Sequence, residues 1–339
     1  MLDKVKENQV TVNALQYKHL IAGRPKSGKT SLFHGIVKKK YDGDMSKGLL
    51  IAFERGYQAL RGIHAIDIES WEDFQELVEE LVDNKSEVSY EVLALDTIDV
   101  LINRATAYML HKQSIRDKKK YEAVNDLAYG RGYELLERTI ADEIDKLDQA
   151  GYNLMFITHD KDKTFTQKDG LEYDKTVISA GGRAGDYFKN SADMIHFIDI
   201  TKEVEKGKKV DKRYIYFRGD GELEAGSRFP QIVKKVEYSV DNFINSIEDA
   251  IKAEYEDTES MEEAKEEQAQ EKEEQLEKQA EESNLTAEEL IAQIDESLKS
   301  KTVQDKKAIA GLIKEEFGVG NYKKFENTED LKKVLKMVK

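Results

Sequence analysis

The chain has 339 residues, of which 36% are charged and 39% are apolar, and it contains no cysteine. Disulfides, thiolate chemistry and cysteine-based zinc sites are therefore excluded. No run approaches the roughly 20 apolar residues that span a bilayer, and the first ten residues lack the apolar stretch of a secretory signal, so we expect a cytoplasmic protein. Of the net charge of −15, residues 245–283 carry −12 and residues 284–339 carry +1, which leaves −4 for residues 1–244. This nearly neutral region is compatible with a polyanionic partner.

In residues 1–244, short apolar runs alternate with longer amphipathic stretches. The candidate strands are His19–Ala22, Leu49–Phe53, Val92–Leu95, Leu154–Thr158, Met194–Ile200 and Tyr214–Arg218. Helical periodicity lies between several of them, as in Trp71–Val82 and Tyr133–Ala150. This alternation predicts an α/β core in which helices flank a mostly parallel sheet. The last two strands, joined across Glu203–Asp211, are more typical of a hairpin at one edge of that sheet.

The remaining chain divides into an acidic spacer and a small helical domain. Residues 245–283 are rich in Glu, Lys, Gln and Ala without a sustained heptad, which favours a solvated helix or a disordered spacer over a coiled coil. Residues 284–339 regain apolar periodicity and predict a small all-α domain of three helices. Thr286 and Glu289 form a capping-box pattern, and Gly318 is placed to end the second helix.

The segment after the first candidate strand has the pattern of a phosphate-binding loop. Gly23, Gly28, Lys29 and Thr30 fit G-x-x-x-x-G-K-[ST] between an apolar strand and an apolar-periodic helix. In such a loop Lys29 would reach the β- and γ-phosphates, and the Thr30 hydroxyl would bind Mg²⁺. The predicted nucleotide-binding residues are Gly23, Arg24, Pro25, Lys26, Ser27, Gly28, Lys29, Thr30 and Ser31. The expected cofactors are therefore ATP and Mg²⁺, and an ordinary strand–turn–helix is the alternative.

A second metal ligand is expected at Asp96, where the apolar run Glu91–Asp96 ends. A carboxylate at the end of a buried strand can reach Mg²⁺ at this edge of a doubly wound sheet, although an Asp that caps the next helix is the alternative. Leu49–Phe53 lies between the P-loop strand and this strand. An inserted central strand is typical of the additional-strand ATPases, which use a catalytic Glu to polarise water, and it makes a nucleotide kinase less favoured.

The sequence LLIAFERGYQAL, residues 49–60, resembles the RecA-like ATPases. In that family an acidic residue ends the strand after the P-loop helix, and the resemblance implies that Glu54 is the general base. The alternative is a surface Glu paired with Arg55 or Arg61. Similarly, the run Leu154–His159 resembles the strand that ends in a polar γ-phosphate sensor. His159 stands where RecA has Gln, and a structural histidine is the alternative.

Over about residues 15–235 the chain resembles, more closely, the phage RecA-like ATPases that act as single-strand annealing proteins or recombinases. The motifs that carry this resemblance are the P-loop, Glu54, LALDT at 93–97, the helix start at 126–133, ITHD at 157–160 and AGSRFP at 225–230. The resemblance implies a DNA-stimulated ATPase in the bacterial host cytosol. The implied partners are single-stranded DNA, further copies of the chain in a ring or filament, and a phage single-strand-binding or replication protein.

Arg228 lies in the last of these motifs. The family usually has Ala-Lys-Asp-Arg here, so Gly226 and Ser227 replace the lysine and the acid. By resemblance, Arg228 would reach the γ-phosphate of a neighbouring subunit, which can accelerate hydrolysis by about 10³–10⁵. An arginine that pins an edge strand is the alternative.

Two stretches have the composition of mobile DNA-binding loops. The first, residues 111–121, contains Lys112, Arg116, Lys118, Lys119 and Lys120. The second, Asp160–Asn190, contains Lys161, Lys163 and Arg183 among aromatic residues, together with the glycine-rich run at 181–185. Basic side chains neutralise phosphates and aromatic rings stack on bases, so we expect sequence-independent binding. A solvated charged surface is the alternative in both cases.

The sequence therefore predicts an ATP-dependent protein that binds single-stranded DNA and promotes annealing or strand exchange. One alternative is a ring-forming helicase or helicase loader. Another is a module that binds ATP without hydrolysing it and recruits replication partners through the acidic spacer and the tail.

Overall fold

A computed structural model describes residues 8–168, 170–205, 208–219, 221–283, 285–299, 301–325 and 327–338. The chain divides into two compact units, residues 1–271 and 272–339. None of the described helices is both long enough and apolar enough to cross a membrane.

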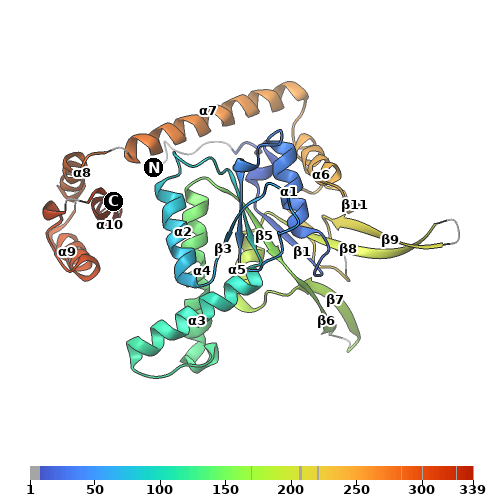
Figure 1. Ribbon diagram of the computed structural model, residues 1–339, viewed down its shortest axis with the longest axis horizontal. Coiled ribbons are helices and arrows are strands. Elements are labelled where there is room, and N and C mark those ends of the chain that lie inside the picture. The colour runs from blue at the N-terminus through green and yellow to red at the C-terminus, as the bar shows by residue number, and fades with distance from the viewer. Residues whose placement is uncertain are drawn as a thin grey trace. The chain divides into compact units, whose positions relative to one another are not determined.

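The first unit is built on a mainly parallel sheet with the strand order β11-β9-β8-β1-β5-β4-β2-β3, and β10 pairs with β8 (Figure 1). The strands are β1 His19–Gly23, β2 Gly48–Ala52, β3 His64–Asp67, β4 Val92–Asp96, β5 Asn153–Thr158, β8 Met194–Glu205, β9 Lys208–Tyr216, β10 Gly226–Ser227 and β11 Lys235–Glu237. The predicted hairpin is confirmed, because β8 and β9 pair in antiparallel fashion. β11 pairs outside β9 and forms the edge that was expected for the hairpin.

The strand inserted between the P-loop strand and the Asp96 strand is β5. Leu20 of β1 and Leu95 of β4 both pair with Phe156. The expectation that Leu49–Phe53 is the inserted strand is therefore wrong, since β2 lies on the far side of β4. Chain order does not set neighbours in a parallel sheet, because each crossover helix can carry the chain past existing strands. The additional-strand arrangement itself is present, and the fold is that of a RecA-like P-loop NTPase core.

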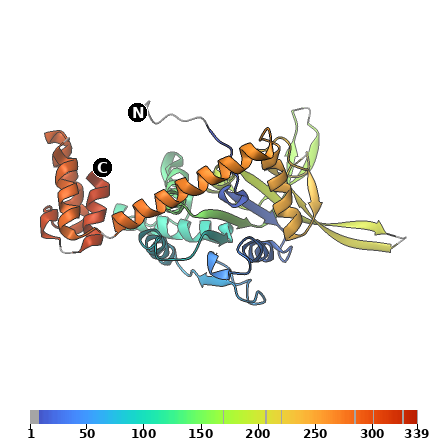
Figure 2. The same cartoon turned by 90° about the horizontal axis from the view of Figure 1, so that it is seen from above.

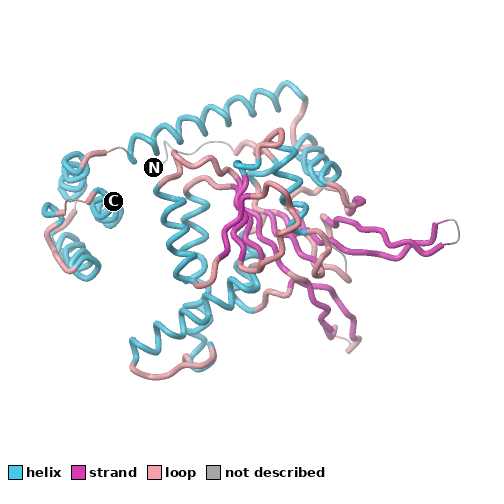
Figure 3. Tube along the Cα trace, in the orientation of Figure 1, coloured by secondary structure: helices cyan, strands magenta, loops and turns pink. Residues whose placement is uncertain are grey.

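Helices cover both faces of the sheet (Figure 3). They are α1 Lys29–Lys40, α2 Trp71–Asp83, α3 Ile98–Asp117, α4 Arg131–Gln149, α5 Gly182–Ser191 and α6 Val240–Lys252, with short 3₁₀ turns at Ala14–Gln16, Met45–Lys47, Val124–Asp126 and Ala128–Gly130. Side chains alternate between the faces: Leu93 and Leu95 pack with α2, α3 and α4, whereas Val92 and Ala94 pack with α1 and α6. Burial on both faces explains the continuous apolar runs in the sequence.

The α/β unit extends beyond residue 244, where its end was expected. Phe243, Ile247 and Ile251 of α6 are buried in the same apolar cluster as α1. Fully burying such a side chain contributes about 1.5–3 kcal/mol. The first residues of the expected spacer therefore belong to this unit.

Most of the two segments predicted as mobile loops has regular structure instead, although residues 118–121 form a turn after a helix. His111–Asp117 is the end of α3. Within 160–190 lie a hairpin, β6 Asp160–Thr166 with β7 Glu172–Ile178, and then α5 (Figure 1). Cross-strand pairs hold the hairpin, among them the stacked rings of Phe165 and Tyr173, whose centroids lie 5.7 Å apart. The hairpin escaped prediction because its strands are mostly exposed on both faces and lack an apolar alternation.

Most of the rest of the expected spacer is helical, in α7 Thr258–Ser283 (Figure 2). The second unit contains α8 Ala287–Lys299, α9 Val303–Phe317, a 3₁₀ turn at Tyr322–Lys324 and α10 Thr328–Val338 around an apolar cluster. Two local predictions are confirmed: Glu289 accepts from the Thr286 amide and hydroxyl while its own amide donates to the Thr286 hydroxyl, and Gly318 caps α9 in the left-handed conformation.

Candidate nucleotide site

The loop between β1 and α1 requires glycine at two positions. A Cβ at Gly23 would lie 2.6 Å from the carbonyl oxygen of Ile198 on β8, so a side chain would collide with backbone. Gly28 has a φ of +103°, which is strained for other residues. Gly28 also caps α1 without a side-chain hydrogen bond. The first amides of α1 therefore remain available for phosphate oxygens.

Lys29 lies inside this loop and is 6% exposed. Its Nζ donates to the carbonyl oxygens of Gly23, at 2.7 Å, and Arg24, at 3.1 Å. Burial lowers the pKa of Lys29, and the nearby carboxylates of Asp96 and Asp160 oppose that shift. A buried ammonium that is bonded to neutral carbonyls gains from an added anion, so the loop is arranged to accept a phosphate group.

Thr30 and Asp96 provide two oxygen atoms suited to Mg²⁺. The Thr30 hydroxyl donates to Oδ2 of Asp96 at 2.6 Å, and Asp96 is 7% exposed. Burial raises the pKa of Asp96, while Thr30 and Lys29 lower it. A buried carboxylate beside a hydroxyl fits a hard cation that takes its other ligands from water and phosphate. Within the described residues, no group of three or more His, Cys, Asp or Glu side chains is arranged to hold a metal ion by itself.

Glu54 and His159 meet the same site from the ends of β2 and β5, the two strands on either side of β4. Glu54 follows β2, is exposed, and donates its amide to the carbonyl oxygen of Asp96 at 3.2 Å. His159 follows β5, and the charge of Glu54 contributes to raising its pKa, after a larger effect from Asp99. The alternative partner Arg55 instead pairs with Asp67, at 3.0 Å. The site therefore gathers at the carboxyl ends of β1, β2, β4 and β5, which we call the nucleotide edge.

Asp99, in the first turn of α3, is a central residue that sequence reasoning missed. Its Oδ2 accepts from the Thr158 hydroxyl at 2.9 Å and from the His159 amide at 3.0 Å, and Oδ1 accepts from the Ser179 hydroxyl. Burial raises the pKa of Asp99, but the nearby His159 imidazole and these hydrogen bonds outweigh burial and lower the pKa to about 2. The sequence did contain a signal for Asp99: it lies three residues after Asp96, in a helix that starts just after the end of β4.

Arg213 and Tyr238 were also missed, and both lie against the P-loop. The Tyr238 hydroxyl donates to the Gly28 carbonyl oxygen at 2.8 Å. The Arg213 guanidinium lies 4.8 Å from the centre of the Tyr238 ring, and its Nη1 would be 2.9 Å from a Cβ at Gly28. No local motif marks them, because the pairing of β9 with β8 and β11 brings them to Gly28 from distant parts of the sequence, 210 residues away for Tyr238.

Arg228 lies away from the P-loop of its own chain. Its Nε pairs with Oδ1 of Asp193 at 2.8 Å, and its side chain is 66% exposed. Ser227 pairs with Met194, which is level with the first residue of β1, whereas the P-loop follows the last. This ion pair matches the alternative in which Arg228 pins an edge strand. A contact with the triphosphate of a neighbouring copy stays a prediction.

The basic residues predicted to contact DNA are exposed but lie on different elements. Lys112, Arg116, Lys118, Lys119 and Lys120 occupy the end of α3 and the turn after it, which we call the basic end of α3. Lys161 and Lys163 lie on β6, and Arg183 lies in the first turn of α5. The basic end of α3 and the β6–β7 hairpin both project from the body of the unit (Figure 1).

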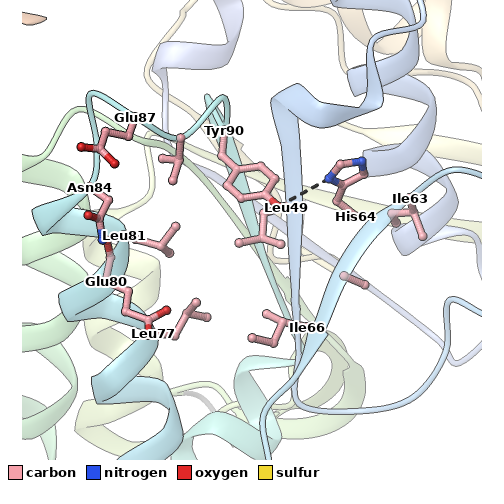
Figure 4. Close-up of a pocket in the computed structure, with 12 residues that line it drawn as sticks. Leu49, Ile63, His64, Ile66, Leu77, Glu80, Leu81, Asn84, Glu87 and Tyr90 are labelled. Carbon is pink, nitrogen blue, oxygen red and sulfur yellow. Dashed lines mark hydrogen bonds between the residues drawn. The ribbon is translucent and has the colours of Figure 1, made fainter.

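A pocket of about 820 Å³ lies between the edge strand β3 and α2 (Figure 4). Ile66, Leu77 and Leu81 line it, with Tyr90 and His64 at one side. None of the P-loop residues lines this pocket. It is therefore separate from the nucleotide edge.

The chain is similar to several known proteins. The sequence matches the AAA domain over residues 15–229. The SPbeta prophage-derived uncharacterized protein YorG of Bacillus subtilis (strain 168) is 26% identical over 235 residues, which cover 66% of this chain and 67% of that protein. The crystal structure of a KaiC-like protein from Pyrococcus horikoshii OT3 matches with 15% identity and a TM-score of 0.38, over 66% of this chain and 85% of that one.

Proposed function

The chain belongs to the AAA domain family, and from this premise we propose that it is a phage-encoded, Mg²⁺-dependent ATPase that binds single-stranded DNA and promotes annealing or strand exchange. The observation that carries the proposal is the nucleotide edge, where the buried Lys29, the Thr30–Asp96 pair, Glu54 and His159 converge. The β6–β7 hairpin begins at the residue after His159. A prophage-derived relative supports the phage origin.

Each residue of the nucleotide edge has a distinct role in this proposal. Lys29 neutralises the β- and γ-phosphates, and the amides at the start of α1 bind their oxygens. Glu54 accepts a proton from the attacking water, for which its exposed position is suitable. His159 contacts the γ-phosphate. Thr30 and Asp96 hold Mg²⁺, which when bound neutralises charge on the phosphate oxygens.

DNA binding is assigned to the basic end of α3 and to the hairpin. Lys118 and Lys119 are exposed, and Lys119 lies 5.0 Å from the centre of the Tyr121 ring. Tyr129 nearby in sequence is fully exposed. Exposed cations neutralise phosphates, and aromatic rings add about 1–3 kcal/mol per stacked base. The hairpin supplies Lys163 beside Phe165, at 5.0 Å. Arg228 contacts the γ-phosphate of the next copy in a homo-oligomer.

The proposal is tested with Lys29→Ala. We expect this substitution to abolish ATP hydrolysis and ATP-dependent retention of single-stranded DNA, because the phosphates lose their buried cation. Lys38→Ala is the matched control, since Lys38 is an exposed lysine in the last turn of α1, outside the loop, and it should retain both activities. Unchanged ATP-dependent retention in Lys29→Ala would refute the mechanism.

A second measurement separates the competing functions. ATP hydrolysis by the unaltered chain is titrated with single-stranded and duplex DNA at several salt concentrations, beside strand-annealing and unwinding assays. We expect stimulation by single strands that fades as salt rises, together with annealing. Unwinding without annealing would favour a helicase, and ATP binding without turnover would favour a recruitment module.

A further inference from the structure

Asp99 joins three segments that are otherwise separate in the chain. It lies on α3 with its side chain 19% exposed. One carboxylate oxygen holds the end of β5, through the Thr158 hydroxyl and the His159 amide. The other oxygen accepts from the hydroxyl of Ser179, the residue that follows β7. The Ser179 amide in turn donates to the His159 carbonyl oxygen at 2.8 Å.

Both ends of the β6–β7 hairpin therefore depend on this carboxylate. β6 begins at Asp160, directly after His159, and β7 ends at Ile178, directly before Ser179. On the P-loop side, Arg24 lies 3.7 Å from Asp162 of β6. The hairpin base thus contacts the nucleotide edge at two places, and Asp99 accepts hydrogen bonds from the residues that flank both strands.

The His159 imidazole is close to Asp99 without being locked to it. Nδ1 lies 3.6 Å from Oδ2 of Asp99, which is too long for a good hydrogen bond. Lys29 and Glu54 also act on the imidazole, with opposite signs, while Asp99 has the largest effect and raises its pKa. A γ-phosphate would add a second anion that competes with Asp99 for the same ring.

We propose that Asp99 is a positioning residue that links His159 to the β6–β7 hairpin, so that a triphosphate in the P-loop changes the conformation of the hairpin. This inference rests on the proposed ATPase function and assigns a residue to its coupling. Movement of the imidazole toward the γ-phosphate releases one partner of Asp99. The Asp99 carboxylate then readjusts its hydrogen bonds with Thr158, the His159 amide and Ser179, and the base of the hairpin moves with these residues.

The test compares Asp99→Asn with Thr164→Val in the full chain. Asparagine keeps the shape of Asp99 and one acceptor oxygen but removes the charge. Thr164→Val is the matched control, because it breaks the bond from Thr164 to Asp174 within the same hairpin and touches no residue of the nucleotide edge. The measurements are hydrogen exchange of residues 160–178 with and without Mg²⁺ and the analogue AMP-PNP, and the kcat and KM of ATP hydrolysis.

In the unaltered chain and in Thr164→Val, we expect the nucleotide to slow exchange in the hairpin. In Asp99→Asn this difference should shrink by about tenfold, within the usual range of coupling between sites. The KM of Asp99→Asn for ATP should stay within about threefold of the unaltered value, because the P-loop contacts are intact, while its kcat falls. A purely structural role would instead accelerate exchange with and without nucleotide alike.

Ser179→Ala keeps the inference testable if Asp99→Asn fails to fold. It removes only the hydroxyl that ties the end of β7 to Asp99, and it should lose the response of the hairpin while kcat is retained. A full nucleotide response in Asp99→Asn or in Ser179→Ala would overturn the inference, as would the absence of any response in the unaltered chain that binds nucleotide. If the unaltered chain binds no nucleotide, the proposed ATPase function itself fails.

Discussion

The nucleotide edge and the basic end of α3 both carry several charged side chains, but they hold them differently. At the nucleotide edge, Lys29 and Asp96 are buried and bonded to loop carbonyls or a hydroxyl. At the basic end of α3, Lys118 and Lys119 are exposed. Buried charges cost free energy unless their surroundings or a ligand compensate them, whereas exposed charges cost almost nothing. Large, site-specific effects are therefore expected at the first region, and small, additive ones at the second.

The largest expected effect within this comparison belongs to Glu54→Gln. Removing the general base should lower kcat by about 10²–10⁴, while the affinity for ATP is retained, because Lys29 and the start of α1 still bind the phosphates. Single-turnover hydrolysis and calorimetric titration with ATP measure the two quantities. Glu69→Gln is the control, because Glu69 is another exposed acidic residue and lies 4.0 Å from Arg55, the residue after Glu54. A kcat within about twofold of the unaltered value would remove Glu54 from the mechanism.

A second prediction concerns a buried pair outside the nucleotide edge. His19 and His196 are fully buried, with Nδ1 of the first 3.0 Å from Nε2 of the second. Burial lowers the pKa of His19 from 6.5 to about 4. Below pH 6.5 the unfolded chain binds a proton that the folded chain refuses, so the free energy of unfolding falls as the pH falls from 6.5 to 4. The loss of unfolding free energy that belongs to His19 alone is about 3 kcal/mol.

Urea denaturation at pH 7, 5.5 and 4.5 measures this loss. His19→Gln should have a weaker dependence on pH over this range, although it is less stable at pH 7. His111→Gln is the control, because His111 is exposed on α3, and it should keep the pH dependence of the unaltered chain. An identical pH dependence in all three chains would contradict the assignment to His19.

Smaller effects are expected at the basic end of α3. The double substitution of Lys118 and Lys119 by Gln should weaken single-stranded DNA binding and reduce the slope of log K against log salt by about 1.4, or 0.7 for each phosphate contact. Fluorescence anisotropy with a labelled oligonucleotide measures the slope. The matched control replaces Lys208 and Lys209, which are exposed on β9, by Gln. This control should leave the salt slope unchanged. Equal slopes in all three chains would move the DNA surface elsewhere.

The smallest effect is predicted for Tyr238→Phe. This substitution removes only the hydrogen bond to the Gly28 carbonyl oxygen, and a bond of this kind contributes about 0.5–1.5 kcal/mol. The affinity for ATP should therefore fall by no more than about tenfold. Tyr57→Phe, which removes a bond to Asp67 instead, should bind ATP normally. An affinity loss as large as that of Lys29→Ala would show that Tyr238 contacts the nucleotide directly.

The sequence was most informative where a single short segment determines the geometry. The P-loop needs glycine where the backbone is left-handed or meets another strand, and an amphipathic helix must follow the loop, so its residues could be recognised from spacing alone. The apolar runs of the buried strands predicted the parallel sheet for the same reason, because burial on both faces excludes polar residues. Composition, in contrast, misled at residues 111–117 and 160–178, where charged sequences form the end of a helix and a hairpin.

The sequence by itself determined the phosphate loop, the acidic strand end at Asp96 and the class of the fold. Only the tertiary structure decided that β5 separates β1 from β4, that Asp99 joins His159 to Ser179, and that Arg213 and Tyr238 lie against Gly28. The physical reason is the range of the interactions involved. Hydrogen bonds and backbone strain within a few residues leave a local pattern in the sequence, whereas contacts across a sheet depend on which strands become neighbours.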